Sequence, residues 1–263
     1  MTTRELLLSA WDWEPSVVIG CAALVVVYLV LRGAARKGCP TSFLSGTLLL
    51  LFALVSPLDT LGDTYLFSAH VVQHFLLALI IPPLWLLGTP RSLAGAALRQ
   101  PSLRRIEHVL AQPLAAWTLG VGMMLGWHVP ALFNAALASD GLHIFQHVSF
   151  LITGTIFWWP VLCPVPERRM APLQAIGYLF SACVSCSLLG AVLTFMPPGA
   201  YPAYLNPDDQ LGILKLVRND WGLDARTDQQ LGGLLMWVPG CFVYLTGILA
   251  TAARWYGAAG QEA

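Results

Sequence analysis

The chain has 263 residues, a formal net charge of zero, 57% hydrophobic residues and 11% charged residues. Soluble domains contain roughly 25% charged residues, so this composition excludes an ordinary water-soluble domain, and we expect no nucleic-acid partner. The first fourteen residues are polar and acidic and lack the basic region of a signal peptide. The chain is therefore expected to be a multi-pass protein of a membrane.

Hydrophobic segments follow one another along almost the whole chain. A helix needs about 17–25 mostly apolar residues to cross a bilayer. Seven segments are candidates, at about 16–31, 41–56, 64–87, 113–128, 141–162, 172–196 and 230–252. They predict an all-α fold, a bundle of seven transmembrane helices that forms one domain over residues 1–263. Pro82 and Pro83 predict a kink or break inside the third segment.

The charges predict how the bundle is oriented. Ten of the fourteen basic residues fall in one set of alternate loops, namely Arg32, Arg36, Lys37, Arg91, Arg99, Arg104, Arg105, Arg168, Arg169 and Arg254. Eleven of the fourteen acidic residues fall in the other set. Because basic loops stay in the cytoplasm, we expect the amino terminus outside and the carboxyl terminus in the cytoplasm. The basic stretch 91–107 is expected to meet anionic lipid.

Five of the six histidines lie near the predicted outer face. The third segment contains His70 and His74, the fifth contains His143 and His147, and His128 ends the fourth. Residues four apart share one helix face, with Cβ atoms about 6 Å apart, so each pair presents two imidazoles together. Imidazole is a common ligand of copper, zinc and iron. The pattern predicts a metal site, and haem ligation, proton transfer and a purely structural polar network are the alternatives.

Three further residues are secondary candidates for this site. Asp63 precedes the third segment, Asp228 precedes the seventh, and Met196 ends the sixth on the same side. Either carboxylate could bind the metal or orient an imidazole, or it could cap a helix instead. Methionine in a span more often serves packing than metal binding.

Two other stretches carry polar or reactive groups. Cys183 and Cys186 form a Cys-x-x-Cys motif inside the sixth segment, where close helix packing and a redox or relay pair are both open interpretations. His108 lies in the basic loop and is expected to be solvated. The apolar middle of the long outer connection, Gln210–Val217, is expected to form an interfacial helix over the pocket.

Several motifs together resemble the CtaG family of cytochrome c oxidase assembly factors. They are Ser56-Pro57-Leu58-Asp59, Ser68-Ala69-His70-Val71-Val72-Gln73-His74, Trp127-His128-Val129-Pro130, His143-Ile144-Phe145-Gln146-His147, Asp228-Gln229-Gln230 and Met236-Trp237-Val238-Pro239-Gly240. They spread over about residues 55–250, which is most of the chain.

The resemblance implies a multi-span bacterial inner-membrane protein, not an enzyme, that helps to build haem–copper oxidase of the respiratory chain. It implies oxidase subunits as partners, with copper supply as the role and a periplasmic copper donor upstream. Joined to the histidine pattern, it leads us to expect copper, as Cu(I) or Cu(II), in an outward-facing pocket. A haem-binding membrane redox protein and a metal-free scaffold are the alternatives.

Overall fold

The computed structural model describes residues 2–33 and 39–262, with side chains described as far as Gly257, and this part of the chain contains helices and no β-strand. The predicted all-α class is therefore confirmed for the described residues. Arg36 and Lys37, which contributed to the predicted charge asymmetry, lie outside them.

Thirteen α-helices occur in the described part of the chain. They are α1 (Thr3–Ser9), α2 (Pro15–Arg32), α3 (Pro40–Val55), α4 (Pro57–Thr60), α5 (Phe67–Phe75), α6 (Ile81–Gly88), α7 (Arg91–Ala97), α8 (Pro101–Leu110), α9 (Pro113–Trp127), α10 (Pro130–Leu137), α11 (Asp140–Leu162), α12 (Pro172–Phe195) and α13 (Ala225–Glu262). Most of the longer ones begin at proline, which suits the first helical turn because the N–H that it lacks has no intrahelical acceptor there.

Several of these helices can cross a bilayer. Four helical stretches are long and apolar enough, namely Pro15–Arg32, Phe67–Gly88, Pro172–Phe195 and Ala225–Gly257. The number rises to six if each of two bent pairs is one span, α3 with the segment Pro57–Tyr65 (46° bend) and α8 with α9 (72° bend). Many large apolar side chains on the long helices are exposed, including Ile19, Phe180 and Leu249, as expected of surfaces that face lipid.

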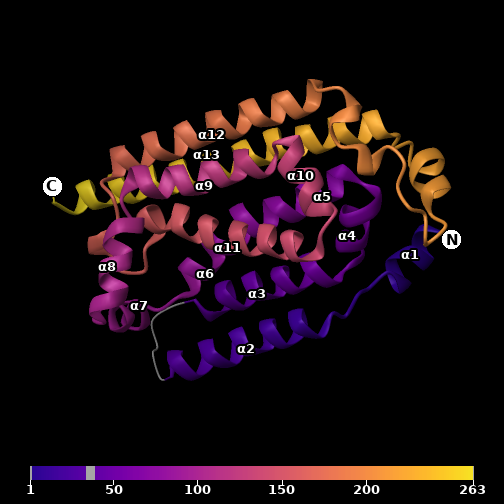
Figure 1. Cartoon of the computed structure of the whole chain (residues 1–263). Coiled ribbons are helices and arrows are strands. Elements are labelled where there is room, and N and C mark those ends of the chain that lie inside the picture. The colour runs from indigo at the N-terminus through magenta and orange to yellow at the C-terminus, as the bar shows by residue number, and fades with distance from the viewer. Residues whose placement is uncertain (1, 34–38, 263) are drawn as a thin grey trace.

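The long helices run roughly side by side, with the short α7 and α8 gathered at one end of the bundle and the amino terminus at the other (Figure 1). α2 packs on α3, α3 on α6, α11 on α6 and α9, and α13 on α5 and α12. Gly154 of α11 permits one close approach, because a Cβ there would lie 2.5 Å from the carbonyl oxygen of Ala78. The stretch α5–α6 is therefore enclosed by other helices.

The third predicted segment corresponds to the helical stretch Phe67–Gly88, which begins three residues after the expected start at about 64. Leu66 is extended, with φ −133° and ψ 115°, and it separates α5 from the π-helix η1 (Leu61–Tyr65). Residues up to Tyr65 continue the bent second segment instead. The predicted start at about residue 64 thus lies within a few residues of the observed one, and the N-terminus of α5 contacts a distant part of the chain, described below.

The prolines of the third segment are accommodated without a sharp turn. A second π-helix, η2 (Leu76–Ile80), precedes α6, and Pro82 stands in the first turn of α6. Proline clashes with the carbonyl four residues earlier, and the wider π-turn relieves this clash. The predicted local break is thus a change of helix type.

One helix was not predicted from the sequence, and a second was predicted at the wrong residues. α10 forms a helical connection between α9 and α11. The helix expected at Gln210–Val217 is displaced, since the turn of helix in this connection is η6 (Leu216–Asp220). Gly212 there has φ +64°, a conformation that ends regular helix.

Candidate metal centre

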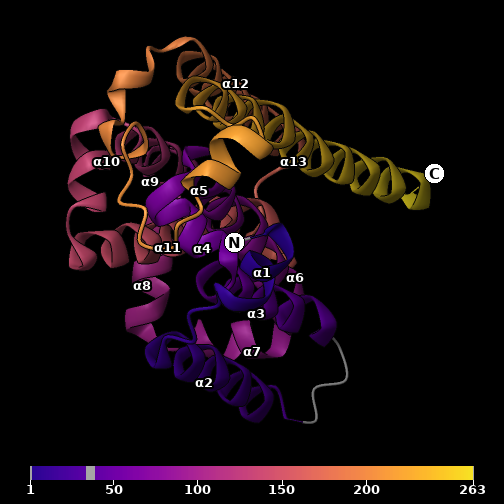
Figure 2. The ribbon, with the colours of Figure 1, turned by 90° about the vertical axis from the view of Figure 1, so that its right-hand side faces the viewer.

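The five predicted histidines meet at the end of the bundle that carries the amino terminus. His70 and His74 come from α5, His143 and His147 from the first two turns of α11, and His128 from the C-terminus of α9. Figure 2 looks onto this end, where the connection between α12 and α13 passes in front of α5. Three separate helices therefore deliver imidazoles to one place.

The two pairs face each other as the four-residue spacing predicts. The ring centroids of His70 and His74 are 4.1 Å apart, and those of His143 and His147 are 4.2 Å apart. Between the helices, His70 lies 5.3 Å from His143, and His74 lies 5.5 Å from His147. His128 adjoins the group, 6.0 Å from His74.

Three members have donor atoms at the spacing of a metal site. One ligand atom each from His70, His74 and His143 lies within 4.8 Å of the other two. Two nitrogens bound to one ion at about 2.0 Å can be at most roughly 4 Å apart. Small rotations of the rings would close the remaining distance, so these residues fit a single ion.

The imidazoles are buried and have unused nitrogen atoms. Relative exposure is 0% for His70 and His74, 3% for His128 and 8% for His147. Both ring nitrogens of His70 and of His74, and Nε2 of the other three, are buried without a hydrogen-bond partner in the described part of the chain. Leaving such a group without a partner costs about 1–3 kcal/mol. A bound cation would reduce this cost by using the one lone pair that each neutral ring offers.

His128 has a defined tautomer. Its Nδ1 lies 2.7 Å from the carbonyl oxygen of Met124, and because a carbonyl only accepts, Nδ1 must carry the proton. Nε2 is therefore unprotonated and available as a donor to metal. Such an outer hydrogen bond is what usually orients a metal-binding imidazole.

Asp63 lies beside the cluster. One carboxylate oxygen is 3.6 Å from Nε2 of His143, so this residue of η1 lies next to the site, and its role as a secondary ligand or an orienting group stays a prediction. Asp59, one turn earlier, accepts a hydrogen bond from Nε2 of the fully buried Gln73, which also donates to the carbonyl of Ala53. The Gln73 amide therefore ties α3 and α4 to α5 at a position between His70 and His74.

Asp228 is used to cap α5. Its two carboxylate oxygens accept the backbone N–H of Phe67 at 2.7 Å and that of Ser68 at 3.1 Å, and the Ser68 hydroxyl also donates to it. The residue is fully buried. A carboxylate at a helix N-terminus satisfies free N–H groups and meets the positive end of the dipole. This arrangement favours the capping interpretation and holds α5 in place from α13.

The third secondary candidate, Met196, adjoins the same region through Gln229. Its carbonyl accepts from the Gln229 amide at 2.7 Å, and its side chain packs against the apolar core. These contacts correspond to the packing interpretation.

Aromatic residues that the sequence did not single out cover the cluster. The fully buried Phe133 of α10 lies 4.9 Å from His70 between ring centroids, and Tyr204 lies 6.4 Å from it. Tyr204 donates to the carbonyl of Gly62, and Tyr201 donates to the carbonyl of His128. Burial raises the pKa of both phenols, so they remain neutral donors. The Pro-Tyr repeat at residues 198–204 was the available signal.

The Cys-x-x-Cys motif does not join this site. Sγ of Cys183 lies 3.4 Å from Sγ of Cys241 on α13, whereas Cys186 points toward the carbonyl of Met236. The motif therefore lies in the packing surface between α12 and α13. There the thiol of Cys183 contacts the thiol of a third cysteine, Cys241. His108 is exposed on α8, at the other end of the bundle.

Comparison with known proteins finds a family model and several relatives that match most of this chain. The family model described as cytochrome c oxidase caa3 assembly factor (Caa3_CtaG) matches residues 22–258. An uncharacterised protein of Mycobacterium leprae is 26% identical over 92% of this chain. Uncharacterised proteins of Mycobacterium bovis and Mycobacterium tuberculosis are each 24% identical over 96% of it. The chain spans only 39–40% of the length of these relatives. No solved structure matches.

Proposed function

Since the chain belongs to the family of cytochrome c oxidase caa3 assembly factors, we propose that it binds copper in the histidine cluster and supplies it to a subunit of the oxidase. One observation carries this proposal. Five imidazoles from three helices meet in one buried group, and seven of their nitrogens have no hydrogen-bond partner among the described residues. Metal binding would give the lone pairs of these imidazoles a partner inside an otherwise apolar bundle.

The cluster suits copper as cargo. Imidazole binds both Cu(II) and, with lower preference than sulfur, Cu(I). His70, His74, His143 and His147 would together form a four-nitrogen site, with His128 beside it as a fifth ligand or entry residue. Transfer to a partner requires that an incoming ligand replace an imidazole while the ion stays bound, without change of oxidation state. More donors than one ion needs would permit such stepwise exchange.

The contact between rings favours a small ion over haem. A porphyrin held by two histidines must lie between them. Here the rings of neighbouring histidines are separated by 4.1–6.3 Å between centroids, and His70 is packed against Phe133. The alternative redox protein therefore requires the cluster to open. A visible spectrum of the purified protein tests it, since a Soret band with one haem per chain would support that function.

We further propose that the cluster faces the periplasm of a bacterial inner membrane. The acidic loops at this end and the basic loops at the other end favour this orientation. In this topology both bent pairs and α11 would each cross the membrane, in addition to the four helical stretches that are long and apolar enough. Reporter fusions at Gly95 and at Asp209 test it. Activity in the cytoplasm for the first and outside for the second is expected, and the same compartment for both would contradict the topology.

Oxidase maturation tests the function itself. Cells that carry His74→Ala or His147→Ala should assemble oxidase without its copper-dependent activity, while the variant protein is still found in the membrane. His108→Ala, exposed and at the other end of the bundle, is the matched control and should behave as wild type. Normal oxidase activity in both cluster variants would favour a metal-free scaffold.

A further inference from the structure

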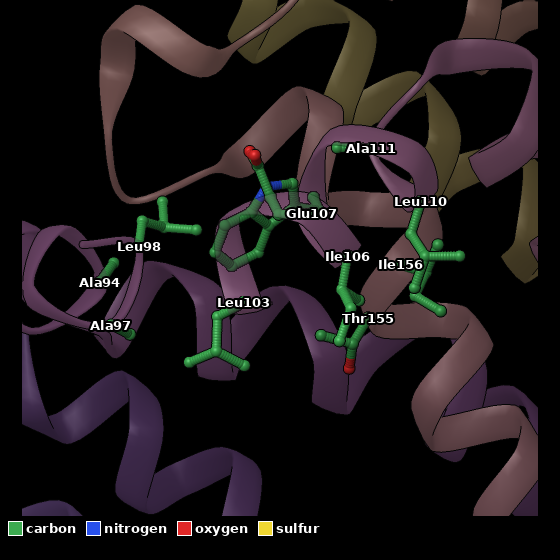
Figure 3. A pocket seen from close by; sticks show the side chains of 11 residues that line it. Ala94, Ala97, Leu98, Leu103, Ile106, Glu107, Leu110, Ala111, Thr155 and Ile156 are labelled. Atoms are coloured by element: carbon green, nitrogen blue, oxygen red, sulfur yellow. The ribbon is translucent and has the colours of Figure 1, made fainter. Parts of the chain in front are cut away.

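An apolar groove lies at the end of the bundle opposite the histidines. It is formed by α7, α8 and α11 and has a volume of about 250 Å³. Figure 3 shows Leu98, Leu103, Ile106 and Ile156 around it. An apolar cavity of about 150 Å³ already stays dry and accepts a benzene-sized molecule. This groove is therefore suited to a longer stretch of hydrocarbon.

The one charged side chain that lines the groove is already paired. A carboxylate oxygen of Glu107 lies 2.5 Å from the guanidinium of Arg168, and the Trp159 indole donates to the other oxygen at 3.2 Å. The Glu107 side chain is only 12% exposed. The groove thus offers its occupant an apolar wall and no free carboxylate.

Helix α8 has the form of a helix that lies along a membrane surface. It is bent by 72° from α9, and none of its residues is buried. Leu103 and Ile106 are 45% and 54% exposed on the side of the groove, while Arg104, Arg105 and His108 line a neighbouring polar hollow with Arg99. A helix with one apolar and one basic face lies in the interface between lipid and water.

The unpaired charge beside the groove is positive. Two acidic residues near the groove, Glu107 and Glu167, are engaged by Arg168 and Arg91 respectively. Arg99, Arg104 and Arg105 form no ion pair within the described part of the chain. An anionic group bound here would therefore meet three free guanidinium groups.

We propose that this groove is a binding site for an anionic phospholipid, with an acyl chain between α8 and α11 and the phosphate on Arg99, Arg104 and Arg105. Basic pockets beside membrane helices bind such headgroups, and guanidinium matches phosphate geometry. Glu107 of the groove pairs with Arg168, which lines the hollow that holds the free arginines, so the two features adjoin and one molecule can use both. This inference does not rest on the proposed copper function.

Native mass spectrometry of the full chain in neutral detergent tests the site. Phosphatidylglycerol and phosphatidylcholine with identical oleoyl chains are titrated separately, and retained lipid is counted. Each arginine near an anionic headgroup contributes roughly a fivefold gain in affinity. Arg104→Gln/Arg105→Gln should therefore raise the half-saturating phosphatidylglycerol concentration roughly 30-fold. The matched control is Arg4→Gln/Arg226→Gln, which removes the same charge from exposed positions at the other end and should change nothing.

The apolar half of the site has its own matched pair. Ala97 lines the groove, whereas Ala96 is an exposed neighbour on the same helix that does not. Ala97→Leu should weaken binding at least fourfold, about the effect of displacing one buried methylene, and Ala96→Leu should not.

The proposal would be overturned by any one of four results. They are equal retention of the two lipids, no effect of the arginine pair, equal behaviour of the two leucine variants, and full competition by glycerol 3-phosphate without acyl chains.

Discussion

Replacing Asp228 by alanine should destabilise the bundle strongly, although the residue lies outside the imidazole cluster. Its fully buried carboxylate accepts the N–H groups of Phe67 and Ser68 at the start of α5 and the Ser68 hydroxyl. Alanine leaves the two N–H groups without an acceptor, at about 1–3 kcal/mol each. The hydroxyl can rotate to another partner, so the two N–H groups together give an expected loss of about 2–6 kcal/mol.

The free energy of unfolding in mixed detergent micelles measures this loss. Asp228→Asn keeps one carbonyl oxygen as acceptor and should lose about half as much. Asp208→Ala is the control, since that carboxylate is exposed and accepts only from the Gln210 amide next to it, and surface changes of this kind stay within about 0.5 kcal/mol. A loss below about 0.5 kcal/mol for Asp228→Ala would refute the capping role.

Three further outcomes follow from the structure. Gly154→Ala should cost about 1–3 kcal/mol of unfolding free energy, because a backbone carbonyl oxygen of η2 lies 2.5 Å from the added Cβ. Gly122→Ala, with open space around it, should be neutral or stabilise by up to about 1 kcal/mol, and equal effects would contradict the packing. The backbone N–H of Thr227 lowers the pKa of Asp224 from 3.8, so this carboxylate stabilises the fold above pH 3.8 and loses that effect as pH falls through its folded pKa. The difference in melting temperature between wild type and Asp224→Asn should therefore shrink below pH 3.8, and a difference independent of pH would show that the charge is not involved. His128→Ala should slow copper uptake in a time course more than it lowers the final copper content, and an equal loss of both would make it a primary ligand.

The histidine cluster was predictable because its signals are local. A four-residue spacing sets the face of a helix whatever the rest of the fold does, and apolar length identifies the segments that hold it. His70 with His74, and His143 with His147, therefore lie together as expected. The alternation of basic and acidic loops also predicts that both pairs lie at the same end of the bundle.

The supporting contacts were not predictable in the same way. The cap of α5 joins Asp228 to Phe67 across 161 positions of sequence, and no local pattern distinguishes that role from metal binding. The extended residue Leu66, directly before the capped N–H groups, is likewise not marked by any local pattern. Likewise, the thiol of Cys183 contacts that of Cys241 and not that of Cys186. The packing of α12 on α13, and not the spacing of the motif, decides which thiols lie together.

Copper content of the purified full chain tests the central proposal most directly. The protein is isolated without chelator, and the ratio of copper to protein is measured for wild type, His74→Ala, His147→Ala and His108→Ala. Wild type and His108→Ala should retain the same amount of copper, and each of the other two should lose most of it, since the remaining imidazoles are fixed on helices and cannot replace a lost donor. Full copper in both His74→Ala and His147→Ala would contradict a shared site.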